Sequence, residues 1–182
     1  MNQNFYDKLN NVIAKDSILL DEPMSRHTTF RVGGPADFFV TPKAKEEVRD
    51  VIRICKEAGM PYYIIGNGSN LLVSDAGYRG VIVQIYKEMN EVKVEVDLVK
   101  AQAGALLSGI AAKALGAELS GFEFASGIPG TIGGACVMNA GAYGGEMKDV
   151  LESVTVLTGE GKIIELGRNE LELGYRTSVI AK

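Results

Sequence analysis

Apolar positions along the chain follow helical spacing in some segments and strand spacing in others. Near the N-terminus they recur three to four residues apart, which predicts an opening helix. These positions are Phe5, Leu9, Val12 and Ile13. Residues 21–27 are predicted to form an irregular linker, and a Gly-Gly-Pro turn then leads into a short, mostly apolar strand over 36–40.

The clearest predicted unit follows this strand. Thr41 is the predicted cap of a helix whose first position is Pro42, where the missing N–H of proline costs nothing. Gly59 ends the helix, and 62–65 is predicted as a buried strand. The apolar stripe of the helix consists of Val48, Val51, Ile52 and Cys55. A strand, a helix and a strand in this order predict a parallel pair joined by a crossover.

The remainder of the chain mixes strands with one further helix. Short strands are predicted at 71–73 and 81–85. The other predicted elements are a hairpin of 92–96 with 98–103, a helix over 106–115 closed by Gly116, and a hairpin of 150–157 with 162–166.

Composition and charge exclude several classes of protein. The 182 residues, 46% of them hydrophobic and 23% charged, suit one ordinary globular domain or two small lobes. A net charge of −4 disfavours nucleic-acid and anionic-membrane partners. One histidine and two isolated cysteines make a metal site improbable, so none is predicted. The polar N-terminus and the lack of a long apolar run predict a cytoplasmic protein.

A glycine-rich loop follows the strand at 62–65. The residues are Gly66, Asn67, Gly68, Ser69 and Asn70. Backbone N–H groups in such a run can hold a phosphate. The loop lacks the lysine of a Walker loop, and Leu71 stands where a Rossmann fingerprint needs its third glycine. A tight turn at the end of a strand is the alternative.

A second glycine-rich stretch covers 121–145 and holds eight of the 22 glycines but a single charged residue, Glu123. Either a flat apolar ligand on the backbone or close packing of a loop over a sheet would account for it. An anion there would rest on backbone amides or on a helix N-terminus near 131–135. Together the two loops suit a dinucleotide that has a pyrophosphate and an aromatic ring system.

Single residues outside the two loops give weaker signals. Arg176, beside Tyr175, could contact a carboxylate or a developing oxyanion, or could simply be solvated. His27 is predicted to be a packed histidine, Cys55 a core residue and Cys136 a bystander in the second loop.

Five runs of this sequence jointly resemble the UDP-N-acetylenolpyruvoylglucosamine reductase family, in the order that the family has them. They are HTTFRVGGPAD (27–37), IGNGSNLLVS (65–74), GIPGTIGG (127–134), NAGAYGGE (139–146) and GYRTS (174–178). The resemblance implies an α+β fold, the FAD-binding domain of the vanillyl-alcohol oxidase (PCMH) type with two α+β lobes. It implies an N-terminal helix and linker over 1–28 and an FAD-binding domain over 29–182, with lobes of about 29–86 and 90–182.

The resemblance also implies a cytoplasmic flavoenzyme of peptidoglycan precursor synthesis. NADPH would reduce FAD, and the enolpyruvyl group of a UDP-sugar would then be reduced to give UDP-N-acetylmuramate. Arg176 matches the active-site arginine of the family, and Tyr175 would contact the substrate. The implied FAD-binding residues are Gly66, Asn67, Gly68, Ser69, Asn70, Gly104, Gly127, Gly130, Thr131, Gly133, Gly134, Ala140 and Gly141.

The chain departs from the family in length. The family's C-terminal substrate lobe, with the serine and glutamate that assist the chemistry, is expected to be absent, so the chain is expected to be an inactive fragment. Two other functions stay open: a non-catalytic module that binds a nucleotide or FAD, and another flavin oxidoreductase of the same fold. The oligomeric state is left open.

Overall fold

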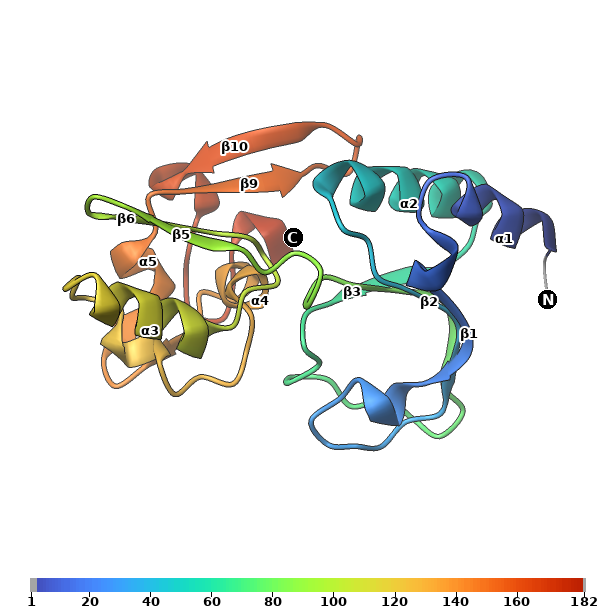
Figure 1. The fold of residues 1–182 in the computed structure, drawn as a ribbon, viewed down its shortest axis with the longest axis horizontal. Helices are drawn as coiled ribbons and strands as arrows, with labels where there is room; N and C mark the ends of the chain where they lie inside the picture. The colour runs from blue at the N-terminus through green and yellow to red at the C-terminus, as the bar shows by residue number, and fades with distance from the viewer. Residues whose placement is uncertain (1–2, 182) are drawn as a thin grey trace. The chain divides into compact units, whose positions relative to one another are not determined.

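The computed structural model describes residues 3–181 and divides into two compact units, Met1–Met89 and Asn90–Lys182 (Figure 1). The first unit holds a four-stranded sheet in the order β1-β2-β4-β3. β1 pairs antiparallel with β2, and β4 pairs parallel with both β2 and β3. The strands are β1 (Ile18–Pro23), β2 (Pro35–Val40), β3 (Tyr62–Ile65) and β4 (Tyr78–Gln84).

The two faces of this sheet are covered differently. Figure 1 shows α1 (Gln3–Asn10) and α2 (Lys45–Glu57) on one side of the sheet. Phe38 and Val40 pack toward these helices, whereas Phe39 between them packs with Met24 and Ile82 in a separate core. Side chains alternate between faces because successive Cβ atoms of a strand point in opposite directions. The predicted opening helix and the strand at 36–40 are confirmed.

The predicted crossover is confirmed in the parallel orientation of its two strands but not in their pairing. β2 and β3 are parallel, but β4 lies between them, so they are not a hydrogen-bonded pair. β4 takes the central place because its run Val81–Val83 is buried on both faces. β3 is left at the edge, where Tyr63 is 50% and Ile64 45% exposed. The prediction of a buried strand at 62–65 is therefore wrong as to burial.

Two other local predictions are wrong. Residues 21–27 are not a linker, because β1 extends to Pro23 and a 3₁₀ turn over Met24–Arg26 follows. An edge strand tolerates proline and charged residues, and Asp21 interrupts the pairing with a left-handed backbone (φ 49°). Residues 71–73 form no strand. Leu71 and Val73 instead pack against the core that contains Met24, Phe39 and Ile82.

Helix α2 begins three residues later than its sequence suggests. Thr41 still belongs to the sheet edge, since its N–H donates to the Ser17 carbonyl at 3.0 Å, so Lys45 rather than Pro42 is the first helical residue. The predicted end at Gly59 is confirmed, with φ of 60° there. The buried stripe consists of Val48, Val51, Ile54 and Cys55, with Ile54 in place of the predicted Ile52.

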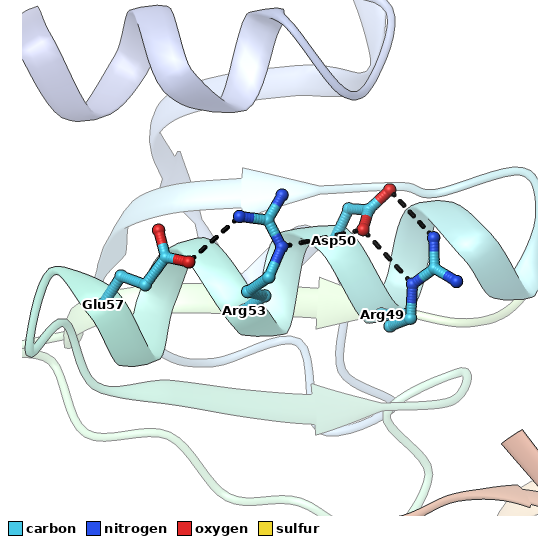
Figure 2. Close-up of polar contacts among 4 residues, drawn as sticks. All are labelled: Arg49, Asp50, Arg53 and Glu57. Atoms are coloured by element: carbon cyan, nitrogen blue, oxygen red, sulfur yellow. Dashed lines mark hydrogen bonds and ion pairs between the residues drawn. The ribbon is translucent and has the colours of Figure 1, made fainter. Parts of the chain in front are cut away.

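The outer face of α2 carries a row of ion pairs (Figure 2). Arg49 Nε lies 3.2 Å from Asp50 Oδ1, and the bond to this carboxylate raises the pKa of the Arg49 guanidinium. Arg53 bridges Asp50 at 3.8 Å and Glu57 at 3.0 Å. Ion pairs between solvent-exposed side chains add little stability, so this face is a solvated surface rather than a site.

The second unit packs short helices and hairpins around a core that includes Leu107, Cys136, Ala140 and Met147. Both predicted hairpins and the helix closed by Gly116 are confirmed. The second hairpin starts at Ser153, because residues 147–150 are helical. The elements are β5 (Val92–Glu95), β6 (Leu98–Ala101), α3 (Leu107–Gly116), α4 (Ile132–Val137), β7 (Gly141–Ala142), β8 (Gly145–Glu146), α5 (Met147–Val150), β9 (Ser153–Leu157) and β10 (Ile163–Gly167).

Short 3₁₀ turns complete the two units, at Lys15–Ser17 in the first and at Glu123–Ala125, Arg168–Leu171 and Val179–Ala181 in the second. Among residues 3–181, no helix has both the length and the apolar character that a membrane crossing requires.

Candidate functional site

The loop over 66–70 leaves β3 with a run of open backbone amides. Its carbonyl oxygens have partners: Gly66 O accepts from Gln84 Nε2 at 3.3 Å, and Gly68 O accepts from the Thr29 N–H at 3.2 Å. By contrast, within residues 3–181 the N–H groups of residues 67–70 donate to no protein acceptor. Four successive unpaired amides in a half-buried loop can bind an anion without any cation.

Gly68 holds this loop against the preceding turn. Its φ is 70°, and a Cβ there would overlap the carbonyl oxygen of His27. His27 itself stacks on Phe39 with ring centroids 3.9 Å apart and contacts Glu22 Oε1 through Nε2 at 2.9 Å. The packed histidine predicted from the sequence is confirmed, and Gly68 serves the close approach of two loop backbones.

At the N-terminus of the helix near 131–135, where an anion was expected to rest, the fold itself uses two of the backbone amides. The first two amides of α4 are already used, because Ile132 N–H donates to Ala105 O and Gly133 N–H to Ala103 O, both at 2.9 Å. These carbonyls flank Gly104, which is buried. Gly133 is required by packing, since a Cβ there would lie 2.9 Å from the Cβ of Ala103.

Other predicted residues of the second stretch are also held by the fold. The Gly130 N–H donates to Ile128 O and the Ala140 N–H to Ala135 O, both at 2.9 Å. Gly141 pairs with Glu146 in the β7–β8 hairpin. The Gly130 and Ala140 amides are therefore held by the fold, and Gly141 shapes the loop as part of the hairpin.

Three residues of this stretch remain open. Within the described residues, the N–H groups of Gly127, Thr131 and Gly134 donate to no acceptor. A Cβ at Gly127 would meet nothing within 4 Å, and one at Gly134 would meet only Thr131 Oγ1 at 3.6 Å. Neither glycine has a positive φ. The fold therefore does not require glycine at these two positions, and both are open to a ligand.

Tyr175 and Arg176 form the tip of a tight turn. Gly174 and Thr177 exchange backbone hydrogen bonds of 3.1 and 3.3 Å across its base. Tyr175 is 95% exposed, and Arg176 is exposed with a left-handed backbone (φ 57°). After the turn the hydroxyl of Ser178, which is fully buried, donates to Val137 O at 2.7 Å. Arg176 thus lies at an exposed tip, and the chain after this turn is hydrogen-bonded to Val137 at the end of α4.

Sequence reasoning missed this attachment. Two bonds tie the base of the turn to a distant segment: Asn139 donates to Gly174 O across 35 residues, and Ser178 donates to Val137 O across 41, which no local pattern reveals. The only sequence signal was indirect: both residues lie inside runs that resemble the reductase family.

The two cysteines take no part in the open loops. Burial alone raises the pKa of the Cys55 and Cys136 thiols to about 12, so both stay protonated and unreactive at neutral pH. The predicted core position of Cys55 is confirmed. In residues 3–181, no group of three or more His, Cys, Asp or Glu side chains could hold a metal ion.

The residues present fit a flavin dinucleotide. The open amides of 67–70 suit a diphosphate, which hydrogen-bond donors bind without lysine or arginine. The open positions Gly127 and Gly134 let a flat ring approach the backbone of the second unit.

Comparisons with known proteins agree with this fit. The profile of a family described as FAD binding domain matches residues 36–167. The UDP-N-acetylenolpyruvoylglucosamine reductase of Clostridioides difficile is 50% identical over 181 residues, and that of Alkaliphilus metalliredigens is 51% identical over 178. These matches cover 100% and 98% of this chain but 60% and 59% of the relatives. The chain thus spans about 60% of the length of the curated relatives it matches.

Solved structures show the same relationship. The UDP-N-acetylenolpyruvylglucosamine reductase of Thermus caldophilus aligns with a TM-score of 0.72 and 37% identity, over 88% of this chain and 55% of its own. p-Cresol methylhydroxylase aligns with a TM-score of 0.69 over 97% of this chain and 39% of its own, and at 18% identity it shows the shared fold alone. The predicted α+β fold of the PCMH type and the predicted resemblance are confirmed. Since the profile covers most of the chain, this protein belongs to the FAD binding domain family.

Proposed function

We propose that this chain is the FAD-carrying part of a reductase that converts UDP-N-acetylglucosamine enolpyruvate to UDP-N-acetylmuramate. The observation that carries the proposal is the run of four open amides at 67–70, in a chain that is 50% identical to proteins named as this reductase. The use of NADPH, a role in peptidoglycan precursor synthesis and a cytoplasmic location belong to the same proposal.

In this proposal the loop residues bind FAD through their backbones. Asn67, Gly68, Ser69 and Asn70 donate their N–H groups to the diphosphate, and Gly66 sets the direction in which the loop leaves β3. Gly127, Thr131 and Gly134 supply open amides in the second unit. The remaining family positions give the second loop its shape: Gly104, Gly130, Gly133, Ala140 and Gly141.

When bound, FAD supplies the transfer of hydride from NADPH to the substrate. The role of Arg176 is electrostatic: its guanidinium binds the substrate carboxylate and stabilises the negative charge that builds there when the double bond is reduced. Tyr175 contacts the UDP-sugar with its exposed ring. In this proposal, the proton that completes the reduction of the double bond comes from the part of the reductase that this chain does not span.

A flavin titration followed by single-turnover kinetics tests the proposal. We would add FAD to the 182-residue chain and to a hybrid protein, in which the chain is completed with the unmatched part of the Clostridioides difficile relative. FAD should bind with a red-shifted or structured visible band. In the hybrid, UDP-N-acetylglucosamine enolpyruvate should reoxidise the reduced flavin without oxygen. If FAD binds to neither protein, the proposal fails.

Arg176→Ala separates the reductase from a non-catalytic FAD-binding module. In the hybrid this variant should retain FAD and lose about 10²–10³-fold in the rate of flavin reoxidation by substrate, as expected when a group that stabilises transition-state charge is removed. Bound FAD that the substrate never reoxidises in the parent hybrid would favour the module, and an unchanged rate in the variant would remove Arg176 from the reaction.

A further inference from the structure

We infer that Asn139 is a positioning residue, which holds the Tyr175–Arg176 turn in place through the carbonyl oxygen of Gly174. The inference deepens the proposed function and rests on it in one respect, namely that Arg176 is the group to be positioned.

The carboxamide of Asn139 is buried and fully bonded. The residue is 3% exposed and follows the C-terminal end of α4. Its Nδ2 donates to Glu146 Oε2 at 2.6 Å and to Gly174 O at 3.1 Å, while its Oδ1 accepts from the Lys148 N–H at 2.9 Å. Two acceptors on one side and a donor on the other leave a single favourable orientation of the amide.

The acceptor Glu146 is itself fixed. It is the N-cap of α5, with its N–H donating to Asp149 Oδ2 at 2.8 Å in a capping box. Its other carboxylate oxygen binds Lys148 Nζ at 3.1 Å. The hydrogen bonds therefore run without a gap from the start of α5 through Glu146 and Asn139 to the carbonyl of Gly174.

The turn needs this support because Arg176 is strained. A left-handed backbone costs a non-glycine residue roughly 1–2 kcal/mol, and such a conformation persists only where the surroundings enforce it. Asn139 anchors the residue before Tyr175, and Ser178 anchors the chain after Thr177 through Val137 O. Both anchors attach to the C-terminal end of α4, so the arginine tip is held from its two sides.

Asn139→Gly tests the inference most cleanly. Glycine accepts the left-handed backbone of this position (φ 45°), so the variant removes the carboxamide without backbone strain. Lys113→Met is the matched control, because it removes a side-chain bond to a carbonyl, that of Val92, elsewhere in the second unit. Asn139→Asp is the second variant. It keeps the side-chain volume but places an oxygen against the Glu146 carboxylate and Gly174 O.

The first readout is hydrogen exchange of the Thr177 amide, which pairs across the base of the turn. In the 182-residue chain, either Asn139 variant should speed this exchange about tenfold relative to core amides, as loss of one buried hydrogen bond would. Lys113→Met should not change it. The inference is overturned if the exchange rate of the Thr177 amide is unchanged in a folded Asn139 variant. It is also overturned if that rate rises only together with the rates of all core amides.

The second readout is kinetic and uses the FAD-loaded hybrid. Asn139→Gly should slow flavin reoxidation by substrate about 10–100-fold with little change in FAD affinity, because small misplacements of a reacting group are costly. Added to Arg176→Ala, it should cost no more than about twofold. Additive losses would overturn the positioning role. If Arg176→Ala alone changes nothing, the proposed function is wrong about Arg176, and Thr177 exchange still decides whether Asn139 holds the turn.

Discussion

At the scale of single residues, the site departs from what the backbone prefers. Arg176 occupies a left-handed conformation that favours glycine, and it is displayed at an exposed tip. Residues that keep a strained backbone are concentrated at functional sites. In the proposed function, the charge of Arg176 accounts for an arginine at a position where stability favours glycine.

Arg176→Gly should consequently stabilise the fold and slow flavin reoxidation by substrate as much as Arg176→Ala does, about 10²–10³-fold. Relief of the left-handed strain should raise the unfolding free energy by about 0.5–1 kcal/mol, which is about 1–4 °C in melting temperature. Thermal unfolding of the 182-residue chain measures the first effect, and flavin reoxidation in the hybrid the second. Arg176→Lys serves as the control that keeps the strain and a positive charge. A lower melting temperature for the glycine variant would contradict this account.

The two buried thiols give a prediction about pH. Their pKa values are raised to about 12 in the folded chain, against 9.0 for an ordinary thiol. The unfolded chain therefore loses these protons first, and the stability that the buried neutral thiols provide is complete below about pH 9 and declines between about pH 9 and 12. Urea unfolding across this range should show the decline.

A variant with both Cys55→Ala and Cys136→Ala is the control for the pH experiment. Its unfolding free energy should fall less steeply above pH 9, because the two ionisations are gone. In the parent chain at pH 8, a disulfide reagent should label the thiols far more slowly than after denaturation. Equal labelling rates in the two states would show that the thiols are not protected.

At the scale of elements, local patterns predicted the pieces and not their arrangement. Alternation of apolar and charged residues over 92–96 identified β5, and the turn residues after 157 identified the β9–β10 hairpin. The position of β4 between β2 and β3 could not be predicted from local sequence patterns. Strand order depends on which apolar strand is buried on both faces at the centre of the sheet.

The candidate site was predictable to the same limited extent. The glycine run at 66–70 predicted a loop of backbone amides that could hold an anion, and the structure leaves the amides of 67–70 without acceptors within residues 3–181. That this loop binds FAD was implied by the family resemblance and is part of the proposed function. Near 131–135, where the sequence suggested an anion on backbone amides or a helix N-terminus, the amides of Ile132 and Gly133 bond to Ala105 and Ala103. Such bonds between distant segments, like that from Asn139 to Gly174, leave no periodic signal in the sequence.

The glycines of the two loops should therefore respond differently to the same substitution. Gly68→Ala should destabilise the first unit by about 2 kcal/mol or more, since its Cβ would overlap the His27 carbonyl at a positive φ. Gly127→Ala should change stability by less than about 0.5 kcal/mol, because its Cβ would meet nothing within 4 Å. FAD affinity should nevertheless fall in Gly127→Ala. Urea unfolding and FAD titration of both variants decide between packing and ligand contact.

At the scale of the whole molecule, the chain consists of two units with separate cores, and each has backbone amides that donate to no acceptor within residues 3–181. If FAD binds the folded chain and not the unfolded chain, the melting temperature of the protein should rise with the logarithm of the FAD concentration. Riboflavin, which lacks the phosphates, should do so much more weakly. A riboflavin effect equal to that of FAD would mean that the diphosphate adds nothing to binding.

In the proposed function, backbone amides and no cation hold the diphosphate of FAD. A nuclear magnetic resonance titration of the ¹⁵N-labelled 182-residue chain with FAD, followed by the same titration with riboflavin, tests these contacts residue by residue. We expect the amide signals of residues 67–70 to move downfield and saturate with FAD, and to move little with riboflavin. If these four signals stay in place when FAD saturates the chain or is present in large excess, the backbone amides of 67–70 do not hold the diphosphate.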